Sequence, residues 1–169
     1  RYEPAPGAVR FERLPAQDIL LQGGCGSDQE PHEPRFVRLA SFDPFRADRS
    51  LDLVIGSSGG PSALSLLVRK SGGGFAARRD YCDQDKGLTG MQIGRLQSPA
   101  EQNFSPASDL VVSSREGRSI SVFTSDYRGV ISADRGRYPL GEIFGTELSL
   151  DGADLADLNG DGWLDLVLG

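Results

Sequence analysis

Short apolar runs, each opened by an aspartate, recur at near-equal intervals along the chain. They lie at 52–56 (DLVIG), 109–113 (DLVVS) and 165–169 (DLVLG), and their first residues are 57 and 56 positions apart (109 − 52 and 165 − 109). Apolar runs of this length, rich in β-branched residues and bounded by turn residues, are typical of buried strands. Two such intervals predict a structural repeat.

The residues around these runs follow a common order. A glycine turn, the apolar stretch ALSLLV and a Gly-rich turn follow the first run, and a turn, the stretch SISVF and another turn follow the second. Apolar residues also precede the runs: Phe36, Val37 and Leu39 before the first, and Met91, Ile93 and Leu96 before the second. No segment shows sustained helical periodicity. The sequence therefore predicts an all-β fold with about four short antiparallel strands in each unit.

Oxygen-bearing side chains alternate in the stretch DLNGDGWLD, residues 157 to 165. Carboxylates this close repel one another unless water or a cation screens them, and calcium takes about six to eight oxygen ligands in irregular loops. We expect a calcium loop rather than a solvated acidic turn. An EF-hand is excluded because the twelfth position is Leu168 instead of Glu. The predicted ligands are Asp157, Asn159, Asp161, the backbone carbonyl of Trp163, and Asp165.

The pattern D-x-N-x-D-G-x-x-D-L-V-x-G, followed by a hairpin with a Gly-rich turn, resembles the FG-GAP/VCBS repeat. That repeat forms the β-propellers of integrin alpha subunits and occurs in many bacterial and fungal secreted proteins. The resemblance extends from about Phe36 to Gly169 and is most specific in the third copy. It implies a calcium-binding β-propeller, in which the loop between the first two strands of a blade holds the ion.

At about 57 residues a unit, the chain holds about three blades of a partial propeller. We expect one propeller domain with four parts: 1–35 as an outer strand of a preceding blade or an N-terminal segment, 36–90 and 91–146 as blades with degenerate loops, and 147–169 as the first two strands of a calcium-binding blade. The remainder of the propeller is then expected from the same polypeptide or another chain. A self-contained domain is the alternative.

The loops of the first two units depart from the acidic pattern. In the first, Asp43, Asp48 and Asp52 remain, but Arg46 and Arg49 add positive charge. This loop is either a weaker second metal loop or, as we favour, a metal-free loop held by salt bridges. In the second unit, the stretch NFSPASD (103–109) retains only its final aspartate, and we expect no ion there.

The chain contains two cysteines, Cys25 and Cys82, at equivalent positions of successive units. An even number in a chain expected outside the cytosol favours a disulfide. Equivalent positions on neighbouring blades, however, usually lie farther apart than a disulfide spans, so both alternatives stay open. A zinc site is not expected, because His32 is the only histidine and the chain has no CxxC motif.

The composition excludes several function classes. The net charge of −6 and the pI of about 4.8 argue against binding to nucleic acid or an anionic membrane surface. No apolar run approaches the roughly 20 residues of a membrane-spanning helix, so no membrane insertion is expected. His32 lies in the loop sequence DQEPHEPR, which favours a solvated histidine, and no phosphate-binding or dinucleotide motif is present. We therefore expect no enzymatic activity.

The sequence favours a binding, adhesion or assembly module that recognises a protein or a glycan. Its expected location is secreted, cell-surface or periplasmic. The alternative is a carbohydrate-binding lectin or the accessory propeller of a carbohydrate-active enzyme. Repeated sugar pockets would require an aromatic residue in each blade, but the counterparts of Trp163 are Ser50 and Ala107. This difference disfavours a multivalent lectin.

Overall fold

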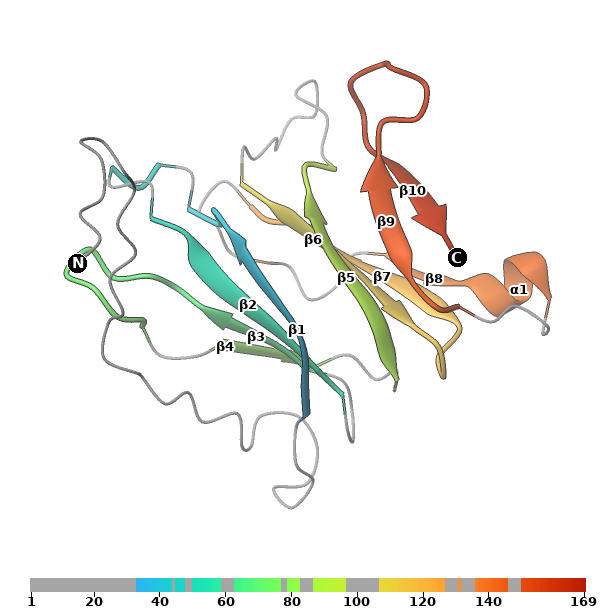
Figure 1. Ribbon diagram of the computed structural model, residues 1–169, viewed down its shortest axis with the longest axis horizontal. Helices are drawn as coiled ribbons and strands as arrows, with labels where there is room; N and C mark the ends of the chain where they lie inside the picture. The colour runs from blue at the N-terminus through green and yellow to red at the C-terminus, as the bar shows by residue number, and fades with distance from the viewer. Residues whose placement is uncertain are drawn as a thin grey trace, which may run out of the picture.

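The computed structural model describes residues 33–43, 45–47, 50–58, 63–76, 79–82, 87–96, 107–126, 131, 136–145 and 150–169. These residues form three antiparallel sheets of four, four and two strands and one short helix (Figure 1). The predicted all-β class is confirmed at this level. Residues 1–32, which hold most of the predicted N-terminal segment and Cys25, lie outside the described residues, as does Asp48.

Each sheet is built from strands that are consecutive in the chain. The first sheet contains β1 (Glu33–Ala40), β2 (Asp52–Ser58), β3 (Ala63–Leu67) and β4 (Arg79–Cys82). The second contains β5 (Leu88–Gly94), β6 (Asp109–Ser114), β7 (Ser119–Phe123) and β8 (Arg137–Pro139). The third contains β9 (Ala153–Ala156) and β10 (Asp165–Leu168). The aspartates of the three apolar runs are therefore the first residues of β2, β6 and β10.

The helix α1 (Leu140–Phe144) follows β8 directly. It begins after Pro139, whose backbone is extended, and ends at Gly145, where φ is +86°. A helix of five residues is too short to produce helical periodicity, which explains why the sequence did not predict it. Among the described elements, no helix is long and apolar enough to cross a membrane.

The first two strands of all three sheets pair in the same register. The aspartate that opens the second strand lies opposite the last residue of the first strand: Ala40 with Asp52, Gly94 with Asp109, and Ala156 with Asp165. The two four-stranded sheets also agree farther along, because Leu64 pairs with Tyr81 and Ile120 pairs with Tyr138. These pairs define equivalent positions in the three sheets.

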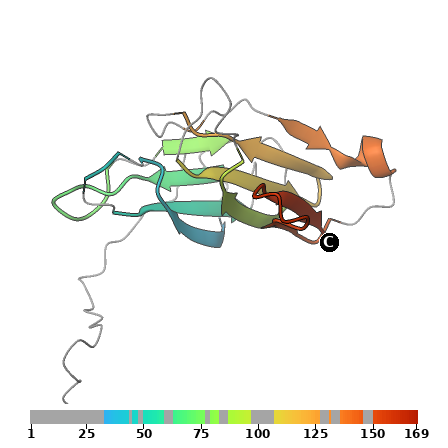
Figure 2. The same ribbon diagram turned by 90° about the horizontal axis from the view of Figure 1, so that it is seen from above.

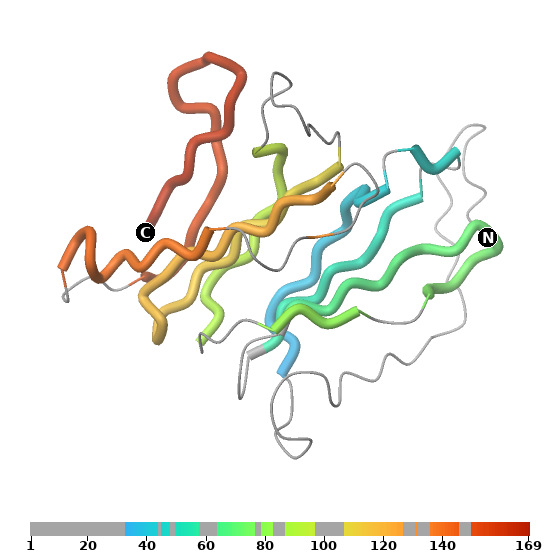
Figure 3. The backbone as a smooth tube through the Cα atoms, turned by 180° about the vertical axis from the view of Figure 1, so that it is seen from behind, coloured from blue at the N-terminus to red at the C-terminus, as the bar shows by residue number. Residues whose placement is uncertain are grey.

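The three sheets lie side by side in chain order (Figure 1). Strands β1, β5 and β9 lie along one side of this row when it is seen from above (Figure 2), and β4 and β8 lie on the opposite side (Figure 3). Strands β1, β5 and β9 run in the same direction, so the loops that follow them leave the sheets on the same side (Figure 1).

The second and third sheets each pack one face against the preceding sheet. We call the face of the second sheet that carries Met91, Leu110 and Val112 its front face, and the opposite face its back face. This front face packs against Val54, Leu64 and Leu66 on the back face of the first sheet. Val111 and Ile120, on the back face of the second sheet, pack against Ala153, Leu155 and Leu168, on the front face of the third. The packing is therefore front to back at both interfaces.

A glycine allows the second and third sheets to approach closely. A Cβ atom added to Gly90 would lie 2.6 Å from Ser113 Oγ and 3.1 Å from the backbone nitrogen of Ala153. The second sheet is covered on both faces, and all residues of β6 are buried. The structure therefore has two apolar cores, one on each side of this central sheet.

Candidate metal centre

The predicted calcium loop connects β9 to β10. Its backbone is wound around Asp157, whose Oδ1 atom accepts the N–H groups of Gly160 (2.7 Å) and Asp161 (3.2 Å) and whose Oδ2 atom accepts that of Gly162 (2.8 Å). The φ angles of Gly160 and Gly162 are +77° and +90°, which glycine adopts without the steric cost of a side chain. The two glycines are thus required by the path of the backbone.

The other polar side chains of this loop stabilise successive turns. Asn159 Oδ1 accepts the N–H of Asp161 at 2.9 Å, and Asp161 Oδ1 accepts the N–H of Trp163 at 2.8 Å. Asp161 Oδ2 accepts a further hydrogen bond of 2.8 Å from the side-chain amide of Asn159. At the end of the loop, Asp165 Oδ2 accepts the N–H of Leu158 at 3.0 Å. Side chains at alternate positions therefore make the same kind of local turn.

The oxygen atoms of this loop suit calcium by their chemistry, because carboxylate, amide and carbonyl oxygens are the ligands that this ion takes. In the structure, however, the carboxylates of Asp157, Asp161 and Asp165 accept hydrogen bonds from the backbone. Across the described ranges, no group of three or more His, Cys, Asp or Glu side chains is arranged to hold a metal ion. The donor set is present, and its carboxylates do not converge on one point.

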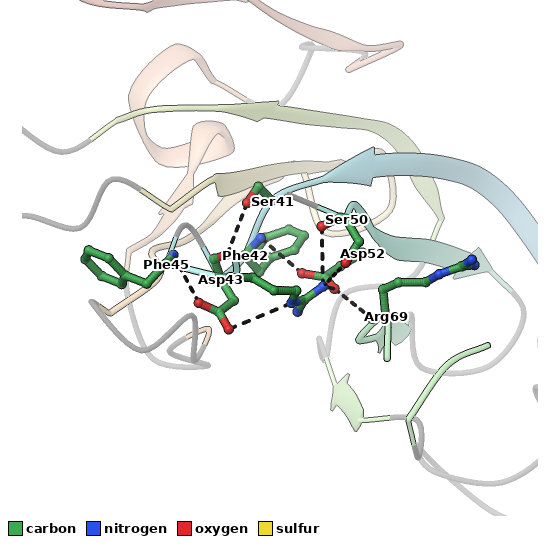
Figure 4. Close-up of polar contacts among 8 residues, drawn as sticks. Ser41, Phe42, Asp43, Phe45, Ser50, Asp52 and Arg69 are labelled. Atoms are coloured by element: carbon green, nitrogen blue, oxygen red, sulfur yellow. Dashed lines mark hydrogen bonds and ion pairs between the residues drawn. The ribbon is translucent and has the colours of Figure 1, made fainter. Parts of the chain in front are cut away.

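The first loop is organised around the buried carboxylate of Asp52 (Figure 4). Its Oδ2 atom accepts the N–H of Phe42 at 3.2 Å, and its Oδ1 atom accepts the N–H of Arg69 at 2.8 Å. Phe42 lies two residues after the end of β1, and Arg69 lies two residues after the end of β3. Asp52 therefore connects the ends of the two strands on either side of β2.

Asp109 makes the same two contacts in the second sheet. It is buried, and it accepts the N–H groups of Leu96 at 2.9 Å and Ser125 at 2.8 Å. In the third sheet, Leu158 is the counterpart of Leu96, and it donates to Asp165. We call Asp52, Asp109 and Asp165 the clamp aspartates. The sequence analysis did not predict this role. A signal for it was present, because the second unit keeps Asp109 although it lacks the other acids of the loop pattern.

The strand register corrects the alignment of the first and third loops. Because Ala40 and Ala156 are equivalent, Ser41 corresponds to Asp157 and Asp43 corresponds to Asn159. Consistent with this, Asp43 Oδ1 accepts the N–H of the residue two positions later, Phe45, at 3.2 Å, as Asn159 does in its loop. Matching the first acid of each loop, Asp43 with Asp157, would therefore misalign the two loops by two residues. The first loop has a serine where the third has its central aspartate.

A basic side chain lies between two acids of the predicted weaker metal loop. Arg46 Nη1 is 2.8 Å from Asp52 Oδ1, and Arg46 Nε is 3.8 Å from Asp43 Oδ2 (Figure 4). The side chain of Arg46 is only 12% exposed. The structure thus brings Asp43 and Asp52 together around a guanidinium group. The third member of the predicted set, Asp48, lies outside the described residues.

Cys82, the last residue of β4, is disulfide-bonded. The other cysteine of the sequence, Cys25, lies outside the described residues, so its pairing with Cys82 stays a prediction. The features that bear on a family are thus the acidic loop, the clamp aspartates and the shared strand register. The chain matches no protein-family model, and comparisons with the curated proteins and with the solved structures find no match.

Proposed function

We propose that the chain is a binding or assembly module that works outside the cytosol, built on FG-GAP-type β-propeller sheets and stabilised by one structural calcium ion. The observation that carries the proposal is the loop between β9 and β10. Its backbone winds around Asp157 through two glycines with positive φ, and oxygen-bearing side chains occupy alternate positions along it.

Calcium would be held by Asp157, Asn159, Asp161, the backbone carbonyl of Trp163, and Asp165. The stretch 157–165 carries three aspartates and no basic residue, so a divalent cation would relieve the repulsion among them. An ion that binds the folded loop alone stabilises the folded state by mass action. Extracellular calcium suffices even for sites with dissociation constants of about 0.1 to 1 mM. The role of the ion in this proposal is structural.

The propeller part of the proposal is supported by the two outermost faces of the row of sheets. The front face of the first sheet is exposed along β1, where Val37 and Leu39 are 54% and 60% exposed, whereas Met91, the counterpart of Val37, is fully buried. Ile55 and Leu67, farther across the same face, are buried. On the back face of the third sheet, Val167 is 39% exposed. Its counterparts in the first and second sheets, Val54 and Val111, are 0% and 2% exposed.

Apolar faces of this kind usually mark surfaces that are covered in the working protein. Because both observed interfaces are front to back, the occupants that fit are further sheets of the same type, from the same polypeptide or another chain. The side of the row on which the loops after β1, β5 and β9 leave the sheets also carries exposed apolar side chains, namely Phe45, Leu158 and Trp163. This side is the surface that we assign to a protein or glycan ligand.

Thermal unfolding with millimolar calcium and with excess chelator tests the calcium part of the proposal. We expect calcium to raise the Tm of the wild-type chain by roughly 5 to 10 °C at saturating concentrations. The variant Asp161→Asn should lose this response. The substitution keeps an oxygen that can accept the N–H of Trp163, so a lost response would not reflect loss of the turn.

The matched control is Asp154→Asn. Asp154 is an exposed aspartate of β9 outside the loop, and its carboxylate accepts the N–H of Leu155. This variant should respond to calcium as the wild type does. A wild-type Tm that is the same in calcium and in chelator would refute the proposed ion, and an equal response of Asp161→Asn would refute the assigned site.

A further inference from the structure

The guanidinium group of Arg46 lies among oxygen atoms of its own loop. Its Nη1 atom donates to Asp52 Oδ1 at 2.8 Å, to Ser50 Oγ at 2.9 Å and to the backbone carbonyl of Ser50 at 3.3 Å. Its Nε atom lies 3.8 Å from Asp43 Oδ2. Two carboxylates, one hydroxyl and one carbonyl therefore surround a single cationic group, and one of these carboxylates is fully buried.

These oxygen atoms are of the kinds that bind hard metal ions. The first and third loops connect equivalent strands and each contains three aspartates, but they differ in basic residues. The stretch 157–165 has none and a formal charge of −3, whereas 41–52 contains Arg46 and Arg49 and has a formal charge of −1 (−3 + 2). The first loop thus contains its own positive charge.

We propose that the guanidinium of Arg46 is the resident cation of the first loop and takes the place of a metal ion there. Asp52 is fully buried, and a buried carboxylate is costly unless it is paired and hydrogen-bonded. A guanidinium provides several donors in a fixed plane, so one side chain bridges Asp52, Ser50 and Asp43. The charges of Asp43 and Asp52 are then balanced without metal, whatever the third loop binds.

The proposal predicts what happens when the guanidinium is removed. In the variant Arg46→Ala, the same oxygen atoms would surround a space of guanidinium size. We expect that space to accept a free guanidinium ion and, because its lining is carboxylate, hydroxyl and carbonyl oxygen, also a calcium ion. Stability lost through the substitution should therefore be regained in part when either cation is added.

The experiment measures the Tm of the full chain in chelator, in millimolar guanidinium chloride and in millimolar calcium, with sodium chloride at matched ionic strength. The control is Arg35→Ala, because Arg35 pairs with Glu33 and its side chain is 60% exposed. In chelator, we expect Arg46→Ala to lower the Tm by on the order of 10 °C. The control should lower it by about 2 °C or less.

Guanidinium should raise the Tm of Arg46→Ala relative to sodium chloride, and it should not raise that of the wild type or of Arg35→Ala. The proposal is overturned if Arg46→Ala and Arg35→Ala have the same Tm in chelator. It is also overturned if Arg46→Ala is destabilised and neither guanidinium nor calcium raises its Tm by more than the same cation raises the Tm of Arg35→Ala.

A second pair of variants covers the case in which Arg46→Ala does not fold. Arg46→Lys keeps a positive charge, and Arg46→Gln has a similar length without charge. We expect the lysine variant to be the more stable of the two, and equal stability would overturn the role of Arg46 as a cation. Asp161→Asn, measured in the same series, reports on the third loop alone. Failure of the calcium proposal and failure of this one are thus distinguishable.

Discussion

The carboxylate of Asp109 accepts the backbone N–H of Ser125 at 2.8 Å, although Ser125 lies two residues beyond the end of β7. Its second oxygen accepts the N–H of Leu96, two residues beyond the end of β5. One buried side chain at the start of β6 therefore holds the chain where both neighbouring strands end. Asp52 makes the same contacts in the first sheet.

We expect Asp109→Ala to lower the free energy of unfolding by about 2 to 6 kcal/mol, because it removes the acceptor of two backbone donors at about 1 to 3 kcal/mol each. Asp109→Asn keeps one acceptor oxygen, and its loss should be about half as large. Urea unfolding followed by circular dichroism measures both. The control Asp154→Ala, at an exposed position, should stay within about 0.5 kcal/mol of the wild type. Equal losses for Asp109→Ala and Asp154→Ala would contradict the clamp.

The close approach of the second and third sheets predicts that Gly90→Ala is destabilising. The added methyl group would meet Ser113 Oγ at 2.6 Å and the backbone of Ala153 at 3.1 Å, so either the sheet or its neighbour must shift. We expect a loss of about 1 to 3 kcal/mol, the usual cost of overpacking. Gly152→Ala is the control, because no atom lies within 4 Å of its added methyl group. A Gly90→Ala protein as stable as this control would show that the interface is looser than described.

Two equivalent valines provide a test of the front-to-back packing. Val111 is 2% exposed against the third sheet, and Val167, at the same position of the third sheet, is 39% exposed. In the 169-residue chain, we expect Val111→Ala to cost about 2 to 3 kcal/mol and Val167→Ala less than about 1 kcal/mol. Chemical denaturation of both variants measures the difference.

The same pair reports on the proposed further sheet. In a protein that contains the remaining sheets, Val167→Ala should become as costly as Val111→Ala, because the back face of the third sheet would then be buried. If Val167→Ala stays inexpensive in that longer protein or complex, no sheet covers this face.

The strands could be predicted because their signal is local. The apolar runs after Asp52, Asp109 and Asp165 are rich in β-branched residues and bounded by turns, and β2, β6 and β10 begin at these aspartates. The antiparallel pairing could be predicted most directly where the connections are short, between β2 and β3 and between β6 and β7. Predicting these strands therefore needed little information from distant parts of the chain.

The role of the clamp aspartates could not be predicted, because their partners are distant in the sequence. Asp52 bonds to residues 10 and 17 positions away, Phe42 and Arg69, which come close only after the sheet has formed. The loops also differ in length: residues 41–51, 95–108 and 157–164 separate the paired strand ends. With such differences, matching the first acid of each loop would place Asp43 against Asp157, two positions from its counterpart, Asn159.

The acidic pattern of the third loop identified residues that the structure does bring into one loop, and their hydrogen bonds explain both glycines. The pattern does not say whether each carboxylate accepts backbone N–H groups or turns toward a cation. The balance between these two states depends on cation concentration as well as on residues. The bridging position of Arg46 was foreseen only as a general salt bridge, because its contact with Asp52 depends on the path of the loop.

The row of sheets has a consequence for how stability is distributed. In the described part of the chain, each sheet packs against its neighbours in the row, so the coupling is of the nearest-neighbour kind found in solenoid repeats. Within the described residues, the second sheet packs against a neighbouring sheet on both faces, and the first and third each pack against one neighbouring sheet. Local opening therefore costs least at the two ends of the row and most in β6, whose amide protons would be the last to exchange with solvent.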